Sequence, residues 1–343
     1  MKRWKTHIGL LLRYCAKMHP AMAPGGHVIV QLSSGKEYRV SVKQVIIDCD
    51  PGIDDALALF AAFASDRLFI RGITTVAGNV PVTLTARNAL ALCTLAGQDI
   101  EVASGATGPL EGEVHTASDV HGQNGLGDVE LPLTGQISTR GADQLLYEEL
   151  IKAGGELEII ALGPLTNLAI LLERHPDVQP YIKKLTLMGG SLGRGNVTPF
   201  AEFNFYADPL AADRVLRSGV PIVMFGLDVT NHALLLPDQI DEIESWGGPV
   251  LTPLVQMIRF YQKFYKSKGM DGLKMHDPLA VAGVIDSRLT EGQAYALGVE
   301  TKDRDTLGKV CILEDPRTVH VCLKVHQEKF SPLFMNLLKS YQM

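Results

Sequence analysis

The sequence predicts a single large α/β domain whose mostly parallel central β-sheet is flanked by helices on both faces. Short apolar runs rich in Val and Ile alternate with Ala- and Leu-rich stretches, and clusters of Gly, Pro, Asp and Asn separate them. Strands that alternate with helices are typical of parallel sheets covered on both sides. No repeat or linker interrupts the alternation after residue 43, so the 343 residues are interpreted as one domain rather than two.

The first strand and helix set the pattern that the rest of the chain repeats. The β-branched run Val45–Ile47 predicts a buried strand, and residues 48–52 predict a turn. Residues 54–63 predict a helix, with Asp54 and Asp55 near the positive end of its dipole. Further strands are expected at Ile70–Val76, Leu157–Leu162, Leu185–Met188, Ile222–Phe225, Val310–Leu313 and Val319–Val325. Further helices are expected at Thr83–Ala96, Leu165–Leu172, Asp208–Arg217, Val250–Lys266 and Pro332–Leu338, the last with Ser331 as N-cap and Pro332 as its first residue.

Charge is spread unevenly along the chain. Residues 1–43 hold eight of the 32 Lys and Arg residues and one of the 38 acidic residues, so the remainder has 24 basic and 37 acidic side chains. An acidic body suits a metal ion or a neutral polar substrate better than nucleic acid. No apolar run approaches the roughly 18 residues of a membrane span. We therefore expect neither nucleic acid nor a membrane as a partner.

The first 42 residues are basic and carry no recognisable motif. We expect them to form a poorly ordered extension, with the folded domain at 43–343. A targeting segment is the alternative, because transit peptides are also basic and poor in acidic residues. The five cysteines are odd in number and none has CxxC spacing, which predicts reduced thiols and a cytoplasmic protein.

Four aspartates fall within eight residues at the first predicted strand–turn–helix junction: Asp48, Asp50, Asp54 and Asp55. Ligands of parallel α/β sheets bind outside the carboxyl ends of the strands, where this junction lies. Carboxylates held close together repel one another unless a positive charge compensates, and residues 44–66 contain no Lys or Arg. Oxygen ligands of this kind favour Ca²⁺ or Mg²⁺. The alternative is a capped helix and a solvated turn.

Two downstream segments carry further polar side chains. His276-Asp277-Pro278 places a carboxylate beside a titratable imidazole, ahead of an apolar stretch that favours a helix. Residues 196–204 form a predicted loop in which amides and a carboxylate are interspersed with apolar residues. Such side chains suit recognition of a sugar through directional hydrogen bonds. Each segment alone is also compatible with a purely structural role.

Taken together, these segments resemble one enzyme family. Residues 48–56, DCDPGIDDA, closely resemble the DxDPGxDDA signature of the inosine–uridine nucleoside hydrolases. The supporting matches are 75–79 (TVAGN), 121–126 (HGQNGL), 163–167 (GPLTN), 188–190 (MGG), 196–204 and 276–278 (HDP). The resemblance covers about residues 43–340 and implies the nucleoside hydrolase fold, calcium-dependent hydrolysis of ribonucleosides to base and ribose, and a homodimer or homotetramer.

The resemblance also implies roles for individual residues. The metal would be calcium, bound by the carboxylates of Asp50, Asp55 and Asp277 and by the backbone carbonyl of Leu162. The residues implied around the ribose are Asp54, Asn79, Met188, Asn196, Glu202 and Asn204. Asp50 would take the proton of the attacking water, and His276, with His121 as a second candidate, would protonate the departing base. Tyr261 and Tyr265, on a predicted helix, would contact the base.

Three other functions compete with this interpretation. A phosphatase of the haloacid-dehalogenase type also has a DxD after a strand, but residues 51–55 do not fit its continuation. A nucleoside phosphorylase would need a phosphate cradle, which the sequence does not display. A catalytically inactive nucleoside- or calcium-binding protein of the same fold is the remaining alternative. The preference for purine or pyrimidine bases stays open from sequence.

Overall fold

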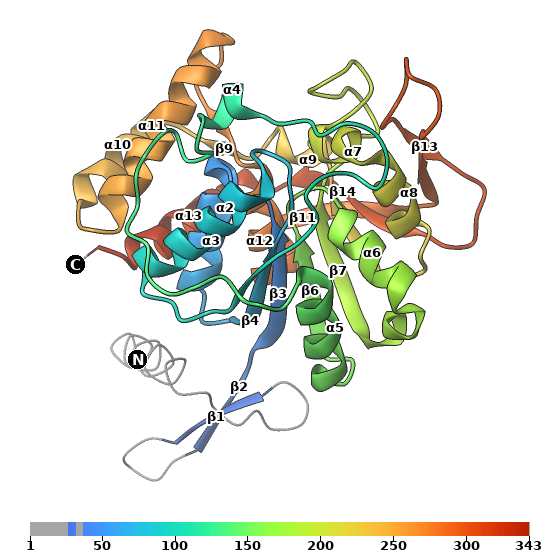
Figure 1. Ribbon diagram of the computed structural model, residues 1–343. Coiled ribbons are helices and arrows are strands. Elements are labelled where there is room, and N and C mark those ends of the chain that lie inside the picture. The colour runs from blue at the N-terminus through green and yellow to red at the C-terminus, as the bar shows by residue number, and fades with distance from the viewer. Residues whose placement is uncertain (1–26, 32–36, 343) are drawn as a thin grey trace.

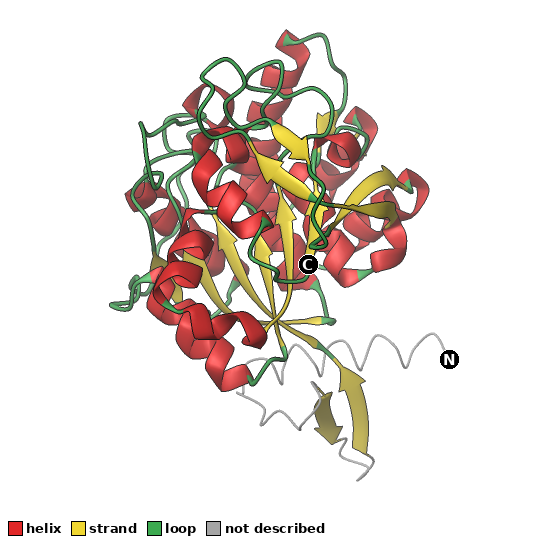
Figure 2. Ribbon diagram, turned by 90° about the vertical axis from the view of Figure 1, so that its right-hand side faces the viewer, coloured by secondary structure: helices red, strands yellow, loops and turns green. Residues whose placement is uncertain are grey.

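The computed structural model describes residues 27–31 and 37–342. The predicted extension 1–42 therefore lies largely outside the described residues. Within it, β1 (His27–Gln31) and β2 (Glu37–Ser41) pair as antiparallel strands, with His27 opposite Ser41. Figures 1 and 2 show this hairpin beyond the end of the sheet at which β3 (Lys43–Cys49) begins. It is thus placed at the opposite end of the molecule from the carboxyl ends of the parallel strands.

One eight-stranded sheet organises the rest of the chain, in the order β11-β14-β8-β7-β6-β3-β4-β5. All pairs are parallel except β11 with β14, which confirms the predicted mostly parallel sheet. The bounds of its other strands are β4 (Leu68–Thr75), β5 (Val102–Ser104), β6 (Leu157–Ala161), β7 (Ile182–Met188), β8 (Ile222–Phe225), β11 (Thr290–Tyr295) and β14 (Val319–Val325). Two small pairs lie outside it, β9 (Leu234–Leu235) with β10 (Leu273–Lys274) and β12 (Leu297–Val299) with β13 (Val310–Ile312).

The strand order reverses beside β3. The chain runs from β3 outward through β4 to β5, then returns to β6 on the other side of β3 and continues outward through β7 to β8. The loops that follow β3 and β6 therefore leave the sheet in opposite directions, which opens a crevice between them. Asp50 and Leu162 both lie directly beyond these two strand ends.

Helices cover both faces of the sheet, as predicted (Figures 1 and 2). Successive side chains of a strand point to opposite faces, and accordingly Val45 and Ile47 belong to one core while Ile46 belongs to the other. The first core is covered by α2 (Ile53–Ala64), α3 (Val82–Ala96), α10 (Pro237–Trp246), α11 (Leu251–Ser267), α12 (His276–Ile285) and α13 (Gln327–Lys339). The second is covered by α5 (Ala142–Ala153), α6 (Thr166–Arg174) and α8 (Pro209–Leu216). The short helices are α4 (Ser118–His121), α7 (Phe203–Ala207), α9 (Leu227–Thr230), η1 (Pro176–Tyr181) and η2 (Ser287–Leu289).

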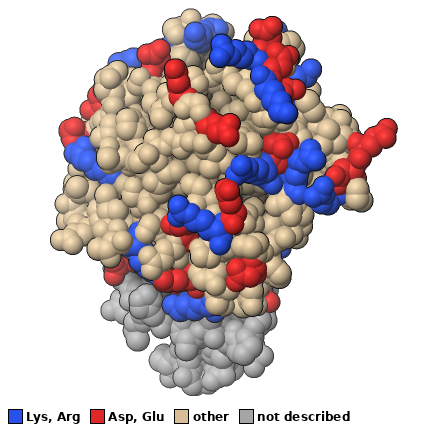
Figure 3. Space-filling view, turned by 45° about the vertical axis from the view of Figure 1, so that its right-hand side comes forward, with Lys and Arg blue, Asp and Glu red and all other residues tan. Residues whose placement is uncertain are grey.

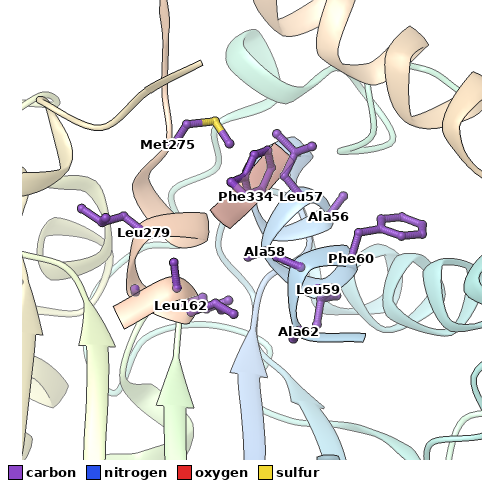
Figure 4. Packing of buried hydrophobic residues seen from close by; sticks show 14 of the residues in the cluster. Ala56, Leu57, Ala58, Leu59, Phe60, Ala62, Leu162, Met275, Leu279 and Phe334 are labelled. Carbon is purple, nitrogen blue, oxygen red and sulfur yellow. The ribbon is translucent and has the colours of Figure 1, made fainter. Parts of the chain in front are cut away.

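Small residues bring α2 and α12 close together. Ala56, Ala58 and Ala62 lie on α2 and are fully or almost fully buried, and α2 packs against α12, the helix that carries Leu279 in Figure 4. Gly283 on α12 leaves room for the Phe225 ring, because a Cβ at this glycine would lie 2.3 Å from its Cζ. The two helices that carry the predicted metal ligands are thereby packed against each other.

Three expected boundaries were wrong. Asp48 is the sixth residue of β3 rather than part of a turn, and Asn204 lies in α7 rather than in a loop. The last helix begins at Gln327, so Pro332 lies inside it and Ser331 is not its N-cap. Pro332 has no N–H, so the carbonyl of Glu328 lacks its helical hydrogen bond; Glu328 is exposed, and water can bind that carbonyl instead. Burial of the phenylalanines on the same helix stabilises the helix despite this loss.

Charged side chains of both signs lie on the surface of the molecule. On the face shown in Figure 3, basic and acidic side chains are interspersed rather than gathered into one basic patch. Among the described residues, no helix has both the length and the apolar character needed to cross a membrane.

Candidate active site

Two helix N-termini and one loop bring the predicted carboxylates together at the crevice. Asp54 and Asp55 lie in the first turn of α2, and Asp277 lies in the first turn of α12. Carboxylate oxygens of these three residues all lie within 4.8 Å of one another, and the three side chains are buried. The positive ends of the two helix dipoles favour negative charge at this point, which explains why carboxylates can be gathered there.

Asp50 lies beside this group but is not one of the three. Its Oδ2 accepts a hydrogen bond of 2.7 Å from the backbone N–H of Asn79, and its own N–H donates to Asp55 Oδ1 at 3.3 Å. The loops at Gly78 and Gly163 leave the space for its carboxylate, because a Cβ at either glycine would fall within 2.6 Å of an Asp50 oxygen. The loops after β3, β4 and β6 thus enclose the Asp50 side chain.

The side-chain amide of Asn79 ties the carboxylates together. It donates to Asp55 Oδ2 at 3.0 Å and to the backbone carbonyl of Asp50 at 3.1 Å. Beneath them, Asp48 accepts hydrogen bonds from Thr74 Oγ1 at 2.5 Å and from Asn167 Nδ2 at 2.7 Å. Asp48 therefore supports the cluster from inside the sheet. Thr74 was not singled out from sequence, and Asn167 was noted only as the last residue of the 163–167 match, because a contact between residues 26 or 119 positions apart leaves no local pattern.

The electrostatics of the cluster are those of a cation site. Burial raises the pKa of Asp54 to about 6 and that of Asp55 to about 7. Burial, together with the neighbouring aspartates, raises the pKa of Asp277 and of Asp50 well above the ordinary value. Within the described residues, Asp54 Oδ1 is buried without a hydrogen-bond partner. An all-oxygen donor set with an unsatisfied buried oxygen fits a hard divalent cation.

The predicted carbonyl ligand, Leu162, and three of the predicted ribose contacts lie on the other side of the crevice, whereas Asp54 and Asn79 belong to the carboxylate group. Asn204 Nδ2 donates to the backbone carbonyl of Leu162 at 2.7 Å and to that of Met188 at 3.0 Å. Glu202 caps α7, accepts from the backbone N–H groups of Gly190 and Asn204, and is buried. Burial raises the pKa of its carboxyl to about 7. Leu162, Met188, Glu202 and Asn204 therefore form one connected group.

Asn196 lies apart from that group. Its side chain is exposed, and its Oδ1 accepts a hydrogen bond of 3.0 Å from the backbone N–H of Phe203. The bond holds the loop that precedes α7. In this structure Asn196 is therefore a rim residue, whereas the other predicted ribose contacts are buried.

Both predicted histidines are buried beside the carboxylates. His121 Nδ1 accepts a hydrogen bond of 3.0 Å from the backbone N–H of Ile53 and lies 3.9 Å from Asp54 Oδ1. His276 Nδ1 lies 2.8 Å from Thr230 Oγ1. Burial lowers the pKa of His121 to about 4 and that of His276 to about 3. Both rings are therefore neutral at pH 7 in the substrate-free protein, which is not the protonated form that the predicted acid role of His276 requires.

Tyr261 and Tyr265 point into the same region from α11. Both are buried, and their hydroxyl oxygens lie 3.3 Å apart. The Tyr261 ring lies 5.5 Å from the His121 ring, measured between centroids. Burial and the nearby Asp54 raise the pKa of Tyr261, so it stays a neutral phenol that can donate a hydrogen bond.

Thr230 is the contact that the sequence interpretation missed. It ends α9, directly beyond β8, and is fully buried against His276. Its position after the strand Ile222–Phe225, at the same edge of the sheet as the aspartates, is the sequence feature that points to it.

Comparison with known proteins gives a consistent result. The profile of the inosine-uridine preferring nucleoside hydrolase family matches residues 45–332. A pyrimidine-specific ribonucleoside hydrolase RihA of Photobacterium profundum is 38% identical over 308 residues, which are 87% of this chain and 99% of the relative. The corresponding protein of Salmonella schwarzengrund is 37% identical over 306 residues, with coverage of 87% and 98%.

Solved structures show the same fold. A purine-preferring ribonucleoside hydrolase from Gardnerella vaginalis aligns with a TM-score of 0.84 at 32% identity, covering 88% of this chain and 99% of its own. A plant nucleoside hydrolase aligns with a TM-score of 0.83 at 32% identity, with coverage of 87% and 99%.

Fold and neighbours place the protein in the class of the nucleoside hydrolases. The chain belongs to the inosine-uridine preferring nucleoside hydrolase family and is a ribonucleoside hydrolase, an enzyme that cleaves N-glycosidic bonds. The phosphatase and phosphorylase alternatives are thereby excluded.

Proposed function

We propose that the enzyme is a calcium-dependent ribonucleoside hydrolase that prefers pyrimidine nucleosides and releases free base and ribose. The observation that carries the proposal is the meeting of three buried carboxylates at two helix N-termini, beside two neutral histidines. The pyrimidine preference is supported by the names of curated relatives that are 36–39% identical to this chain.

The proposed calcium ligands are the carboxylates of Asp50, Asp55 and Asp277 and the carbonyl of Leu162. Support comes from the oxygen-only donor set, since hard cations prefer such ligands. Asp54, whose unpartnered oxygen lies in the same group, is a further candidate ligand or a ribose contact. When bound there, calcium would lower the pKa of a bound water molecule. The Leu162 carbonyl accepts a hydrogen bond from Asn204, so on calcium binding this bond would have to break, or the carbonyl oxygen would have to contact both partners.

Other residues around the crevice would take the proton of the attacking water and bind the ribose. The Asp50 carboxylate, which accepts a hydrogen bond from Asn79, would take a proton from the attacking water while the oxygen of that water bonds to the anomeric carbon. Side chains that accept or donate hydrogen bonds would hold the ribose hydroxyls so that binding energy is used in the reacting geometry. These side chains are Asp54, Asn79, Asn196, Glu202 and Asn204, with Met188 packed against the sugar.

The departing base would contact two histidines and two tyrosines. The electron pair of the breaking C1′–N bond moves onto the base, where hydrogen-bond donors stabilise it. His276 and His121 are the candidates for this assistance. Tyr261 and Tyr265 would bound the base pocket, since both are buried, Tyr261 lies next to His121 and Tyr265 contacts Tyr261.

Two further features belong to the proposal. We assign the enzyme to the cytoplasm, on the basis of its cysteine pattern. We also expect a homodimer or homotetramer, as in the family that it resembles.

Steady-state hydrolysis of uridine, cytidine, inosine and adenosine tests the substrate class. The proposal expects kcat/KM for uridine and cytidine to exceed the values for the purines. Equal or reversed values would reject the pyrimidine preference. Failure to release ribose from any of the four would reject the hydrolase mechanism and favour a binding protein of the same fold.

A further inference from the structure

Thr230 holds one nitrogen of the His276 ring. Its Oγ1 lies 2.8 Å from His276 Nδ1, and Thr230 is fully buried. Either atom of this pair could be the donor by distance alone. The direction of the bond decides which ring nitrogen carries the proton, because a neutral imidazole has one N–H and one acceptor nitrogen.

The surroundings of the hydroxyl settle the direction. Within residues 27–31 and 37–342, His276 Nδ1 is the one hydrogen-bond partner found for Thr230 Oγ1. If Nδ1 donated the proton, the hydroxyl hydrogen of Thr230 would be buried without an acceptor, which proteins avoid. If the hydroxyl donates, both groups are satisfied. His276 then carries its proton on Nε2.

The His121 ring has the same arrangement on independent evidence. Its Nδ1 accepts the backbone N–H of Ile53 at 3.0 Å, so Nδ1 cannot carry a proton. Its proton therefore lies on Nε2. In the described part of the chain, the Nε2 atom of neither ring has a hydrogen-bond partner. Two histidines thus each keep one N–H group available for a ligand.

The element that carries Thr230 is held in place. The short helix α9 begins after Gly226, whose carbonyl accepts the Thr230 N–H at 3.0 Å. Asp228, also on α9, accepts the N–H groups of Leu192 and Gly193 at 2.8 and 3.1 Å. Thr230 therefore reaches His276 from a segment fixed on both sides, as expected of a residue that orients another side chain.

We propose that Thr230 is a positioning residue that donates its hydroxyl proton to His276 Nδ1 and so presents Nε2–H to the departing base. The inference rests on the proposed function, in which His276 faces the leaving group. As the C1′–N bond breaks, its electron pair passes to the base and the resulting charge spreads onto the base carbonyl. The Nε2–H group donates a hydrogen bond to that base and keeps its proton, so no imidazolium is required.

Three variants separate this role from simple packing. Thr230→Val keeps the shape of the side chain and removes the hydroxyl, whereas Thr230→Ser keeps the hydroxyl. Thr94→Val is the matched control, because it removes a hydroxyl bonded to the Leu90 carbonyl in α3, away from the site. The full-length protein is used throughout, and thermal unfolding shows whether each variant folds.

The kinetic comparison uses uridine and p-nitrophenyl riboside, whose leaving group is a stable anion. Thr230→Val should lower kcat for uridine by about 10- to 100-fold, the usual range for an outer partner of a site residue. Its effect on KM and on p-nitrophenyl riboside should stay within about threefold. Thr230→Ser and Thr94→Val should behave like the unsubstituted enzyme. Equal losses on both substrates, or no loss on uridine, would overturn the proposal.

A second readout does not depend on activity. The ¹⁵N chemical shifts of selectively labelled histidine report which ring nitrogen of His276 is protonated. The proposal expects Nε2–H alone in the unsubstituted protein and in Thr230→Ser, and a mixture of tautomers in Thr230→Val. An Nδ1–H or imidazolium signal at neutral pH in the unsubstituted protein would refute it. If uridine is not a substrate but the Nε2–H signal is present and depends on Thr230, the proposed function fails while the tautomer assignment stands.

Discussion

At the scale of single residues, the site depends on carboxylates that are buried without basic partners. Among the described residues, no Lys or Arg forms an ion pair with Asp50, Asp54, Asp55 or Asp277. Leaving buried carboxylates uncompensated is costly, and the cluster could hold a metal ion that compensates them. These aspartates were found from sequence because most of them share one short segment. Thr230 and Thr74 were not found, and the role of Asn167 was not recognised, because each of their contacts exists only after the chain has folded.

Asp50→Asn tests the role of the most enclosed carboxylate. The amide has nearly the same shape, but it cannot take a proton from water and is a weaker ligand for a cation. We expect kcat for uridine to fall by about 10²- to 10⁴-fold, the range of a general base. Asp286→Asn, just past the end of α12 and paired with Arg288, is the control and should keep near-normal kcat. Near-normal kcat in Asp50→Asn would contradict the mechanism.

At the scale of elements, the site is made by helix starts and strand ends. Six of the eight strands of the sheet were predicted, because apolar, β-branched runs between turn residues rarely form anything else, whereas β5 and β11 were missed. Helix starts were predicted less well. The sequence interpretation placed the histidine and aspartate of residues 276–277 before a helix, whereas α12 begins at His276. All ten residues of α12 are buried, so its sequence has no alternation of apolar and polar residues from which the start of the helix could be predicted. The position of α12 depends instead on its packing against α2.

The two helix N-termini predict how stability depends on pH and calcium. In the ion-free protein, burial raises the pKa of Asp54 to about 6 and that of Asp55 to about 7, from an ordinary value of 3.8. Between about pH 4 and pH 7 the folded chain therefore binds more protons than the unfolded chain, so its stability falls as pH rises. Under the proposed function, calcium bound at this cluster would compensate the charge of the ionised carboxylates. Calcium should therefore raise Tm more at about pH 7.5 than at about pH 5.

Calorimetry with chelator and with calcium, at both pH values, measures this difference. Magnesium chloride at the same concentration controls for ionic strength and for ion identity. A calcium-induced gain in Tm that is equal at the two pH values would show that the buried carboxylates are not the binding site.

At the scale of the whole molecule, the length of the sheet separates the site from the hairpin β1–β2. The hairpin β1–β2 lies beyond the amino end of β3, and the carboxylates lie at its carboxyl end (Figure 1). The Nζ of Lys43, the first residue of β3, donates to the Val284 carbonyl of α12 at 2.6 Å. We therefore propose the domain boundary just before this residue. The sequence predicted the boundary from composition alone, and the contact supplies a physical reason for it.

Removal of residues 1–41 tests that boundary. Because the described part of the segment, the hairpin β1–β2, lies at the opposite end of the sheet from the site, kcat/KM for uridine should stay within about threefold of the full-length value. Tm should change little as long as Lys43 is retained. A large loss of activity, or a change in mass by light scattering, would show that the extension contributes to the fold or to an interface between subunits.

Calcium titration of the chelated enzyme tests the central claim most directly. Ribose release from uridine is followed as calcium is added to protein freed of divalent ions, with ion binding measured in parallel. The account predicts negligible turnover without the ion and full recovery when one calcium binds per chain, with neither binding nor recovery in Asp277→Asn. Full turnover in the chelated enzyme, or recovery in Asp277→Asn equal to that of the unsubstituted protein, would contradict it.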